Sequence, residues 1–275
     1  MVKNILTFDA EEWYDVYNYG VKSSKAVCEN RLNIGISKIF SFLDDKKINA
    51  TFFVSGSAAE KNPQVIREID KRGHEIASHG YRHVPISGLN REEFRQDLLR
   101  SVKILEDITG KKVIGYRAPC YSVTADTLWA LDIIKESGLK YDSSIYPVSL
   151  RLATKGGAFG YPRRPFFVKE GLLEFPLATL NLFGIYLPAA TTAYFRIFPY
   201  CVSYIAIKNL NKTGVPATVN FHSWEFDENH PKLKLPFPHN IKHYYNLSKT
   251  SVKFKRLIEN FDFSSCLDKL NETKI

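Results

Sequence analysis

Short apolar runs and helical repeats alternate along the first part of the chain. Asn4–Phe8 and Ile48–Gly56 are apolar, rich in strand formers, and followed by polar residues or closed by small ones, a pattern typical of buried parallel strands. Between them, Asn30–Lys47 spaces its apolar side chains at helical intervals. Asn62–Gly73 begins with asparagine and proline and ends with glycine, the usual start and stop signals of a helix. The pattern predicts strand, helix, strand and helix in that order.

The alternation continues through the rest of the chain. Further helices are predicted at Arg91–Gly110 and Thr124–Gly138, and strands or strand ends at His74–Gly80, Val113–Pro119, Tyr141–Ser144, Leu172–Thr179 and Ala217–Trp224. Strands that alternate with helices imply a parallel sheet flanked by helices, closed or nearly closed. No linker interrupts the pattern, so we predict a single domain over residues 1–275, with the motifs at about 4–227 and a C-terminal helical closure at 228–275.

Two later segments require separate interpretation. Phe183–Asn211 is unusually apolar and aromatic, but Pro188, Arg196 and Pro199 divide it into runs too short to span a membrane. We interpret it as a buried helix of the barrel; the alternative is a face that contacts lipid or a lipid-linked saccharide. His243–Phe263 is expected to form one terminal helix that closes the barrel.

The composition is that of an ordinary globular protein, with 44% hydrophobic and 24% charged residues. The net charge of +9 would suit an anionic partner. The basic residues are scattered, however, and their short clusters, such as Lys46–Lys47 and Arg163–Arg164, accompany no nucleic-acid motif. We therefore expect no nucleic-acid partner. The Arg163–Arg164 pair is expected to contact either an acidic substrate or solvent.

The cysteines and the N-terminal sequence bear on location. The four cysteines lie far apart without a CxxC pair, which predicts reduced thiols rather than a disulfide framework. The sequence MVKNILTFDAEEW reaches a carboxylate after only a few apolar residues, too few for a signal-peptide core or a membrane span. We expect a cytoplasmic protein, with association at the inner face of a membrane as a further option.

Polar residues that could carry chemistry fall just after the apolar strands. They are Asp9, Glu11, His79, His83, Arg117 and His222. In α/β barrels the carboxyl ends of the strands form one face, so residues from separate segments can converge there. This shared placement predicts a single site.

Histidines four residues apart, such as His79 and His83, bind a metal or simply satisfy backbone groups near a strand end. Asp9 and Glu11 favour the metal, because a buried pair of carboxylates is costly unless a cation or a basic partner neutralises it. Two imidazoles and one carboxylate, with open positions for water, make a hydrolytic zinc-type site.

The segments LTFDAEE, TFFVSG, GHEIASHGYRH, GYRAPCYS, YDSS and NFHSWEFD occur in this order over about Asn4–Asp227. Together they resemble the NodB-type polysaccharide deacetylases of carbohydrate esterase family 4, most closely the branch found with exopolysaccharide gene clusters. The resemblance implies an α/β fold, a single distorted (β/α) barrel. It also implies a divalent metal, with zinc as the first choice and cobalt, nickel or manganese as alternatives, and removal of acetyl groups from N-acetylated sugars.

The resemblance assigns a role to each residue of the opening motif. Asp9 is the general base. The metal-binding acid would normally follow it directly, where this chain has Ala10, and in the branch that it resembles the ligand shifts to Glu11. Glu12 is the poorer substitute, because side chains alternate in an extended segment and Glu11 shares the face of Asp9.

The other motifs supply the remaining roles. His79 and His83 match the metal ligands, with Gly80 at a position that is usually serine or threonine. Arg117 matches the arginine that orients and charge-pairs the base, and its charge would favour the carboxylate form of Asp9. His222 matches the general acid, and Asn220 stands where leucine is usual.

The substrate-facing positions depart further from the family pattern. Cys120 stands where a tyrosine usually ends the motif; its backbone N–H would serve the oxyanion. Tyr121 and Trp224 are interpreted as walls for a sugar ring, or else as core residues. The other histidines, His74, His230, His239 and His243, are expected to be surface or packing residues.

These features predict a metal-dependent N-deacetylase that acts on an N-acetylhexosamine unit of a polysaccharide or a lipid-linked saccharide. One alternative is a hydrolase of another amide, such as a cyclic ureide or imide, which relatives of the fold cleave without a metal. The other is a catalytically silent saccharide-binding barrel. The presence of Glu11, His79 and His83 argues against the first alternative, and the complete set of base, ligands and acid argues against the second.

Overall fold

A computed structural model describes residues 2–15, 28–149 and 160–273. The main sheet comprises β1 (Asn4–Ala10), β2 (Thr51–Val54), β3 (Glu75–Ser78), β4 (Gly115–Tyr116), β5 (Tyr141–Asp142), β6 (Phe166–Lys169), β7 (Leu172–Glu174), β10 (Thr218–His222) and β11 (Phe263–Ser264). The strands β8 (Thr179–Leu182) and β9 (Ile185–Pro188) form a separate hairpin.

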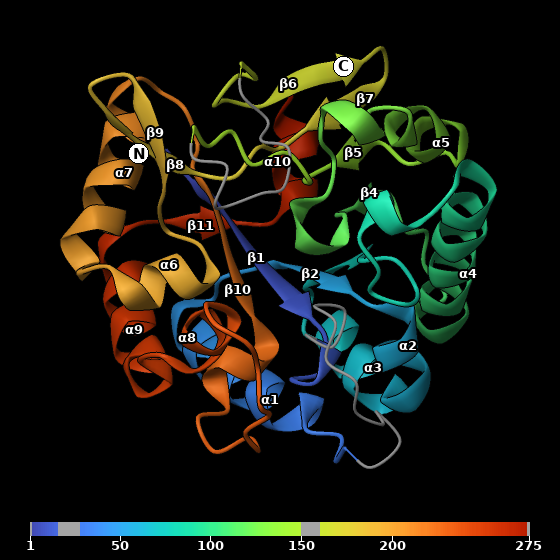
Figure 1. Ribbon diagram of the computed structural model, residues 1–275, viewed down its shortest axis with the longest axis horizontal. Helices are drawn as coiled ribbons and strands as arrows, with labels where there is room; N and C mark the ends of the chain where they lie inside the picture. Colours follow the sequence, from blue (N-terminus) through green and yellow to red (C-terminus); the bar gives the residue numbers. More distant parts are fainter. Residues whose placement is uncertain (1, 16–27, 150–159, 274–275) are drawn as a thin grey trace.

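The helices are α1 (Leu32–Lys46), α2 (Gly56–Lys61), α3 (Pro63–Lys71), α4 (Arg91–Thr109), α5 (Ala130–Glu136), α6 (Thr192–Ile197), α7 (Tyr200–Lys212), α8 (His239–Tyr244), α9 (Thr250–Asn260) and α10 (Cys266–Glu272). Short 3₁₀ turns are η3 (Ile86–Gly88), η4 (Pro119–Tyr121), η5 (Ala125–Thr127), η6 (Ser223–Phe226) and η7 (Leu247–Lys249). In Figure 1 the strands cross the centre of the molecule, with α4 on one side and α7 and α9 on the other.

The main sheet has the strand order β10-β1-β2-β3-β4-β5-β7-β6, and β11 also pairs with β1. Its neighbours are parallel except for β6 and β7. Beyond β7, Leu177 forms a parallel bridge to Thr218 of β10, so the far end of the sheet curls back toward its first strand. The predicted α/β fold, a distorted (β/α) barrel, is confirmed.

The alternation of side chains along the strands separates two cores. Leu6 and Phe8 of β1 face the surrounding helices, in a large apolar cluster that includes side chains of α1, α3 and α4. The alternate residues of β1 point to the inside of the curled sheet, where Ile5 packs with Phe53 and Tyr141 in a smaller cluster. Because successive strand residues point to opposite faces, Thr7 and Asp9 also face the inside.

The predicted helices of the first half are confirmed, with differences at their ends. Helix α4 begins with a capping box between Asn90 and Glu93 and ends at Gly110, whose φ of 70° is left-handed. Asn62 is the N-cap residue of α3, but its side chain donates to Glu12 and to the Ala58 carbonyl instead of capping the helix. The predicted helix 124–138 is divided into η5 and α5.

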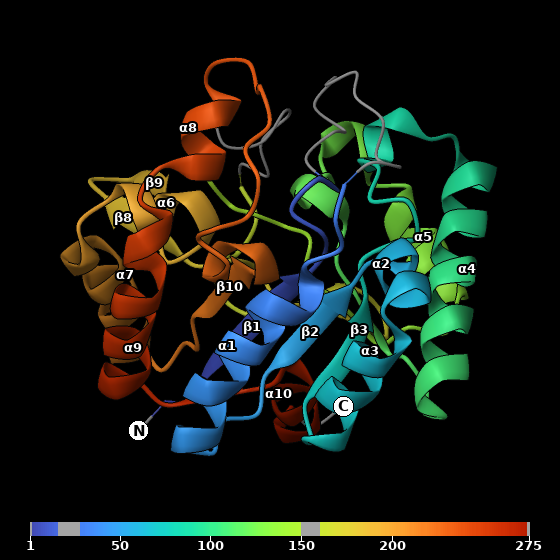
Figure 2. The same ribbon diagram turned by 90° about the horizontal axis from the view of Figure 1, so that it is seen from below.

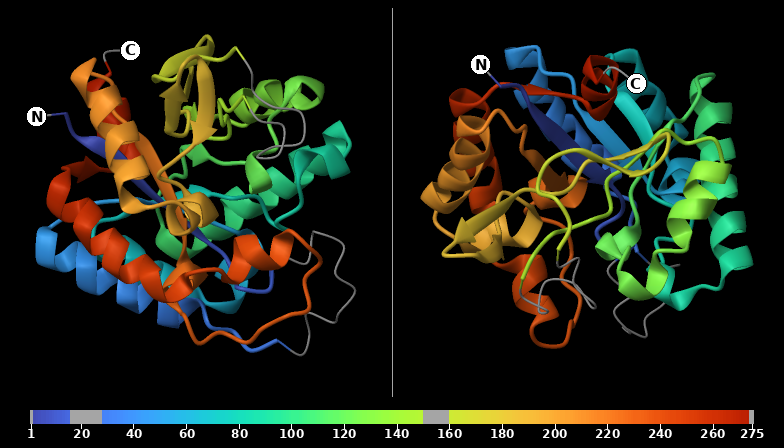
Figure 3. Two further views of the ribbon diagram at one scale, coloured as in Figure 1. Left: turned by 60° about the vertical axis from the view of Figure 1, so that its left-hand side comes forward. Right: turned by 90° about the horizontal axis from the view of Figure 1, so that it is seen from above.

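The segment Phe183–Asn211 is not one barrel helix, and that prediction was wrong. It contains β9, α6 and α7. Phe198 is extended before Pro199, as a residue before proline prefers, and this separates the two helices. Phe183 lies at the tip of the β8–β9 hairpin and is 99% exposed. The hairpin lies beside α7 (Figure 3).

The C-terminal region also differs from the single predicted helix. After α8, Asn246 adopts a left-handed φ of 55°, and the chain continues through η7 and α9. It then adds β11, in which Phe263 and Ser264 pair with Asn4 and Ile5. A two-residue strand leaves no periodic signal, so the pattern could not predict it. Within the described ranges, no helix combines the length and apolar character needed to cross a membrane.

Candidate active site

The carboxyl ends of the parallel strands bring the predicted residues together. Asp9 at the end of β1 pairs in register with His222 of β10, and His79 directly follows β3. Arg117 directly follows β4, which lies beside β3. Figure 2 shows β1, β2 and β3 side by side, with α10 at their amino ends and α8 on the side of their carboxyl ends.

Three buried side chains form a group that could hold a metal ion. One ligand atom from each of Glu11, His79 and His83 lies within 4.8 Å of the others. The Nε2 atoms of His83 and His79 lie 2.5 Å and 3.7 Å from Oε2 of Glu11. Gly80, with a φ of 71°, and His83, with a φ of 54°, turn the loop so that both imidazoles point to the same carboxylate.

The tautomer of His79 is set by the backbone. Its Nδ1 lies 2.8 Å from the carbonyl oxygen of Arg117 and donates to it. The lone pair of Nε2 therefore faces the carboxylates, which is the usual arrangement of a metal-binding histidine. Burial lowers the pKa of His79 to about 4, despite the nearby charge of Asp9, so the ring is neutral.

The charges of Glu11 and His83 depend on each other. Burial alone would raise the pKa of Glu11 and lower that of His83, but their attraction to each other, together with other nearby charged groups, outweighs burial in both. The pKa of Glu11 is therefore lowered, and that of His83 is raised to about 9. Oε2 of Glu11 faces the Nε2 atoms of both histidines. A carboxylate oxygen beside two imidazole nitrogens is a donor set that fits zinc, cobalt, nickel or manganese.

Glu12 lies outside this group. Its carboxylate accepts from the backbone N–H of Arg31 at 3.0 Å and from Nδ2 of Asn62 at 3.3 Å. Glu11 instead accepts from Nε1 of Trp224 at 3.1 Å through its other oxygen, Oε1. The geometry thus places Glu11, and not Glu12, beside the two histidines.

Asp9 is held through both of its oxygens. Nη1 of Arg117 donates to Oδ1 at 2.9 Å, and Nδ2 of Asn220 donates to Oδ2 at 2.7 Å. Arg117 is itself fully buried and bound to the carbonyl and hydroxyl of Ser143. Burial would raise the pKa of Asp9, but the surrounding positive charge, above all that of Arg117, outweighs burial and lowers the pKa.

His222 faces the two carboxylates across the site. Its Nε2 lies 3.8 Å from Oδ2 of Asp9 and 3.7 Å from Oε1 of Glu11. Its Nδ1 lies 3.1 Å from Oε1 of Glu225. Burial would lower the pKa of His222, but the carboxylates of Glu11 and Glu225 outweigh burial and raise it.

Sequence reasoning missed three residues of this site. The family resemblance marks Asn220 only as a departure from leucine, although its side chain donates directly to Asp9. Glu225 stands three residues after His222, a spacing that could have indicated a partner for the ring. Arg196 lies 3.4 Å from Glu225, and both side chains are fully buried. Arg196 comes from α6, a segment without a motif, so no sequence pattern could indicate its role.

The predicted substrate-facing residues are placed differently from one another. Cys120 and Tyr121 are half-buried in η4, with left-handed φ values of 57° and 52°. Trp224 is only 6% exposed, and the rings of His222 and His243 stack on it at 4.9 Å and 4.0 Å. Of the two interpretations given for Trp224, its burial agrees with the core residue: the ring supports Glu11 and His222 from within the core.

The remaining predicted polar residues are structural. His74 stacks on Phe40 at 5.8 Å, and His230 and His243 pack against each other at 5.2 Å. Arg163 donates to the hydroxyl and the carbonyl of Thr179, the first residue of β8.

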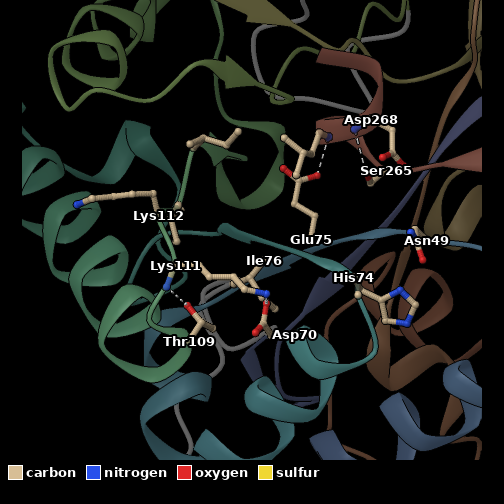
Figure 4. A pocket seen from close by; sticks show the side chains of 14 residues that line it. Asn49, Asp70, His74, Glu75, Ile76, Thr109, Lys111, Lys112, Ser265 and Asp268 are labelled. Atoms are coloured by element: carbon tan, nitrogen blue, oxygen red, sulfur yellow. Dashed lines mark hydrogen bonds and ion pairs between the residues drawn. The ribbon is translucent and has the colours of Figure 1, made fainter. Parts of the chain in front are cut away.

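A cavity of about 340 Å³ lies at the opposite end of the sheet. It is lined by residues at the start of β3, such as His74 and Glu75, and by the first turn of α10. Figure 4 shows that some of its lining residues contact one another, including Lys111 with Asp70 at 2.7 Å. None of the predicted site residues lines it, so this cavity is separate from the candidate active site at the carboxyl ends of the strands.

Two family models match the chain. Residues 6–141 match the family described as polysaccharide deacetylase, and residues 143–271 match a domain of unknown function, DUF3473. A peptidoglycan deacetylase-like protein of Gibberella zeae is 31% identical over 114 residues, which are 41% of this chain and 33% of that protein. The peptidoglycan deacetylase of Helicobacter pylori is 30% identical over 112 residues, 41% of this chain and 37% of that protein. The chain thus spans little more than a third of the length of these relatives.

Solved structures share the fold. A probable polysaccharide deacetylase from Pseudomonas aeruginosa superimposes with a TM-score of 0.63 and 16% identity, over 98% of this chain and 89% of that one. An allantoinase superimposes with a TM-score of 0.60 and 16% identity, over 98% of this chain and 88% of that one. Because enzymes with different substrates share this fold, the fold alone does not identify the reaction.

Proposed function

The chain belongs, through residues 6–141, to the polysaccharide deacetylase family, and from this membership we propose that it is a metal-dependent hydrolase of N-acetylated saccharides. The bond it cleaves is the amide of an N-acetylhexosamine unit. The single observation that carries the proposal is the convergence of Asp9, Glu11 and His222, with two further histidines beside the Glu11 carboxylate.

Glu11, His79 and His83 are the residues that would hold the metal ion. A divalent ion held by two imidazoles and one carboxylate supplies Lewis acidity, which polarises an acyl oxygen and lowers the pKa of coordinated water. Zinc is the first candidate, with cobalt, nickel or manganese as alternatives. The bond from His79 Nδ1 to the Arg117 carbonyl supports this assignment, because it fixes the ring with Nε2 toward Glu11.

The other residues of the site move protons. Asp9, kept ionised by Arg117, accepts a proton from the attacking water through Oδ2. His222, whose pKa is raised, donates a proton to the sugar nitrogen so that it departs as an amine. The backbone N–H of Cys120 stabilises the oxyanion that forms between these steps. Tyr121 lines the substrate side of the site.

The alternatives are less well supported. A cyclic ureide or imide hydrolase without a metal would not require the Glu11, His79 and His83 group. A silent binding barrel would not require the buried Arg196–Glu225 pair behind His222, since burying two charges is costly. We therefore keep N-deacetylation as the function.

The test is acetate release from an N-acetylglucosamine oligomer by zinc-loaded protein, with allantoin and a cyclic imide as parallel substrates. We expect acetate from the saccharide and no turnover of the cyclic compounds. Asp9→Asn should lower kcat roughly 10²–10⁴-fold, whereas the exposed control Asp126→Asn should not change it. Hydrolysis of a cyclic substrate, or equal activity of both variants, would refute the proposal.

The same proposal extends to where the substrate lies. The tip of the β8–β9 hairpin exposes Leu182 by 47%, Phe183 by 99% and Ile185 by 51%. Such side chains support peripheral contact with a membrane that carries a lipid-linked saccharide. Phe183→Ser should weaken co-sedimentation with anionic phospholipid vesicles. The control Val252→Ser on α9, at a site 61% exposed, should not. Equal sedimentation of both would contradict this contact, and the cytoplasmic location and single domain stay predictions.

A further inference from the structure

The side chain of Asn220 joins four groups beneath the candidate active site. Its Oδ1 accepts from Nη1 of Arg117 at 2.6 Å and from the Thr7 hydroxyl at 2.8 Å. Its Nδ2 donates to Oδ2 of Asp9 at 2.7 Å and to the Tyr121 hydroxyl oxygen at 2.6 Å. An amide has two lone pairs and two N–H donors, so this fully buried side chain uses its whole bonding capacity.

These contacts permit only one orientation of the amide. Arg117 can only donate and the ionised Asp9 can only accept. An inverted Asn220 would set its N–H groups against the guanidinium and its oxygen against the carboxylate. The N–H donors of Asn220 must therefore face Asp9 and Tyr121.

The hydroxyl of Tyr121 is left with a hydrogen to donate. Its oxygen accepts the Asn220 N–H, so its own hydrogen must point elsewhere. In the described part of the structure no protein group accepts that hydrogen. Because the same amide nitrogen also binds Oδ2 of Asp9, the hydroxyl lies beside the base, on the side of the site that His222 Nε2 approaches to 3.8 Å.

Tyr121 is held in this place by a backbone conformation that is energetically unfavourable. Cys120 and Tyr121 are successive non-glycine residues with φ values of 57° and 52°, a left-handed conformation that L residues disfavour. The next residue, Ser122, fixes the turn, because its hydroxyl donates to the Pro119 carbonyl at 2.7 Å and accepts from the Ile86 N–H at 3.0 Å. Disfavoured backbone that the surroundings enforce is typical of functional sites.

We propose that Tyr121 is a catalytic residue whose hydroxyl donates a hydrogen bond to the acyl oxygen of the substrate as that oxygen becomes negative. Asn220 is the positioning residue that holds this hydroxyl and Oδ2 of Asp9 in one fixed geometry. The inference rests on the proposed deacetylation. It also accounts for an asparagine where leucine is usual, since leucine could neither bind Asp9 nor orient Tyr121.

The test compares two tyrosines that touch each other. The rings of Tyr121 and Tyr146 pack edge to face at 5.4 Å, but the Tyr146 hydroxyl bonds to Thr191 at 2.6 Å and has no contact with Asp9. Acetate release from an N-acetylglucosamine oligomer is measured with zinc-loaded Tyr121→Phe and Tyr146→Phe. Tyr121→Phe should lower kcat by about 10²-fold, as the loss of one oxyanion donor does, with KM within about threefold. Tyr146→Phe should retain the wild-type kcat.

Asn220→Leu tests the positioning role. It should lower kcat at least as much as Tyr121→Phe, and the double variant should be no slower than Asn220→Leu alone, because residues that act as a unit are not additive. As a further measurement that preserves the fold, 3-fluorotyrosine strengthens the hydroxyl as a donor. At position 121 it should change kcat, and at position 146 it should not.

The outcomes separate the two proposals. An active wild type with an unaffected Tyr121→Phe, or equal losses in Tyr121→Phe and Tyr146→Phe, would overturn the role of Tyr121 and leave deacetylation standing. A wild type that releases no acetate would overturn both. Additive losses in the double variant would overturn the joint action of Asn220 and Tyr121.

Discussion

At the scale of single residues, the orientation of His222 depends on a buried ion pair behind it. Oε1 of Glu225 accepts from Nδ1 of His222 at 3.1 Å, and Nη2 of Arg196 lies 3.4 Å from the same oxygen. Arg196 is in turn fixed by the carbonyls of Lys242 and Tyr245 near the end of α8, each at 2.6 Å. The orientation of His222, the proposed acid, therefore depends on residues of α6 and α8 as well as on its own motif.

Glu225→Gln keeps an acceptor for His222 but removes its charge. We expect kcat for acetate release to fall roughly 10–10²-fold, because the imidazolium loses the carboxylate that stabilises it. The control is Asp227→Asn, which removes a buried carboxylate two residues away that pairs with Arg31. A similar loss in both variants would show that burial, and not the contact with His222, is responsible.

Individual site residues were predictable where side chains alternate or a motif fixes the spacing. The choice of Glu11 over Glu12 followed from alternation after β1, and the contacts of Glu12 with Asn62 agree with it. Asn220 and Arg196 could not be predicted in the same way. Their partners, Asp9 and Glu225, are 211 and 29 residues away along the chain, and only the folded arrangement joins them.

At the scale of elements, helix α1 packs unusually closely against the turn that follows His222. A Cβ atom at Gly35 would lie 2.1 Å from the Ser223 carbonyl oxygen and 2.8 Å from its carbon. Contacts this short require the backbone to move. Gly35 thus allows α1 to support η6, which carries Trp224 and Glu225.

Gly35→Ala should destabilise the protein by roughly 1–3 kcal/mol, as overpacking does, although alanine favours the helix by about 1 kcal/mol. It should also lower kcat, because η6 must shift with His222. Urea unfolding and acetate release measure the two effects. Ser37→Ala, at an exposed position of the same helix, should stay within about 0.5 kcal/mol of wild type. A Gly35→Ala protein with wild-type stability would contradict the close packing.

The strands β5 and β7 carry a second pair of buried carboxyl groups. Asp142 and Glu174 pair across the two strands, and in the described structure Oδ2 of one and Oε2 of the other have no other hydrogen-bond partner. Burial raises the pKa of Asp142 to about 6 and that of Glu174 well above its ordinary value. One proton shared between the two carboxyl groups accounts for both shifts.

This pair predicts a pH-dependent stability. Carboxyl groups in the unfolded chain titrate near pH 4 (about 3.9–4.3). The stability that the protonated Asp142–Glu174 pair contributes to the fold is therefore complete below about pH 4, and it is lost as the pH rises through about 6. Glu174→Gln replaces the shared proton with an amide N–H. Wild type should lose roughly 1–3 kcal/mol more unfolding free energy than this variant between about pH 5 and pH 8. Glu170→Gln, exposed in the β6–β7 turn, should follow the wild type. Parallel pH profiles of wild type and Glu174→Gln would rule out the shared proton.

Among the elements, long periodic segments were predicted and short ones were not. The signals for α4, its capping residues and Gly110 act locally, so the sequence alone shows where it ends. The apolar character of 183–211 predicts one buried helix. In fact the charged Arg196 is buried as an ion-pair partner, and the apolar Phe183 is exposed at a turn. In this segment the polarity of a residue therefore does not predict whether it is buried.

At the scale of the whole molecule, the proposed catalytic set is divided between the two matched regions. The polysaccharide deacetylase match contains Asp9, the three proposed ligands and Tyr121, whereas His222 and Asn220 lie in the DUF3473 match. The pairing of β1 with β10 joins the two regions, since Asp9 and His222 are partners in the register. The barrel class was predictable from alternating strands and helices. The curl that brings Leu177 to Thr218 was not, because no local pattern encodes it.

The central claim is that one divalent ion is held by Glu11, His79 and His83. Crystals soaked with zinc and measured above the zinc absorption edge test it most directly. The account predicts a single anomalous peak at roughly 2.0–2.2 Å from Oε2 of Glu11 and from Nε2 of both histidines. No peak at this position, or a peak held by other residues alone, would contradict it.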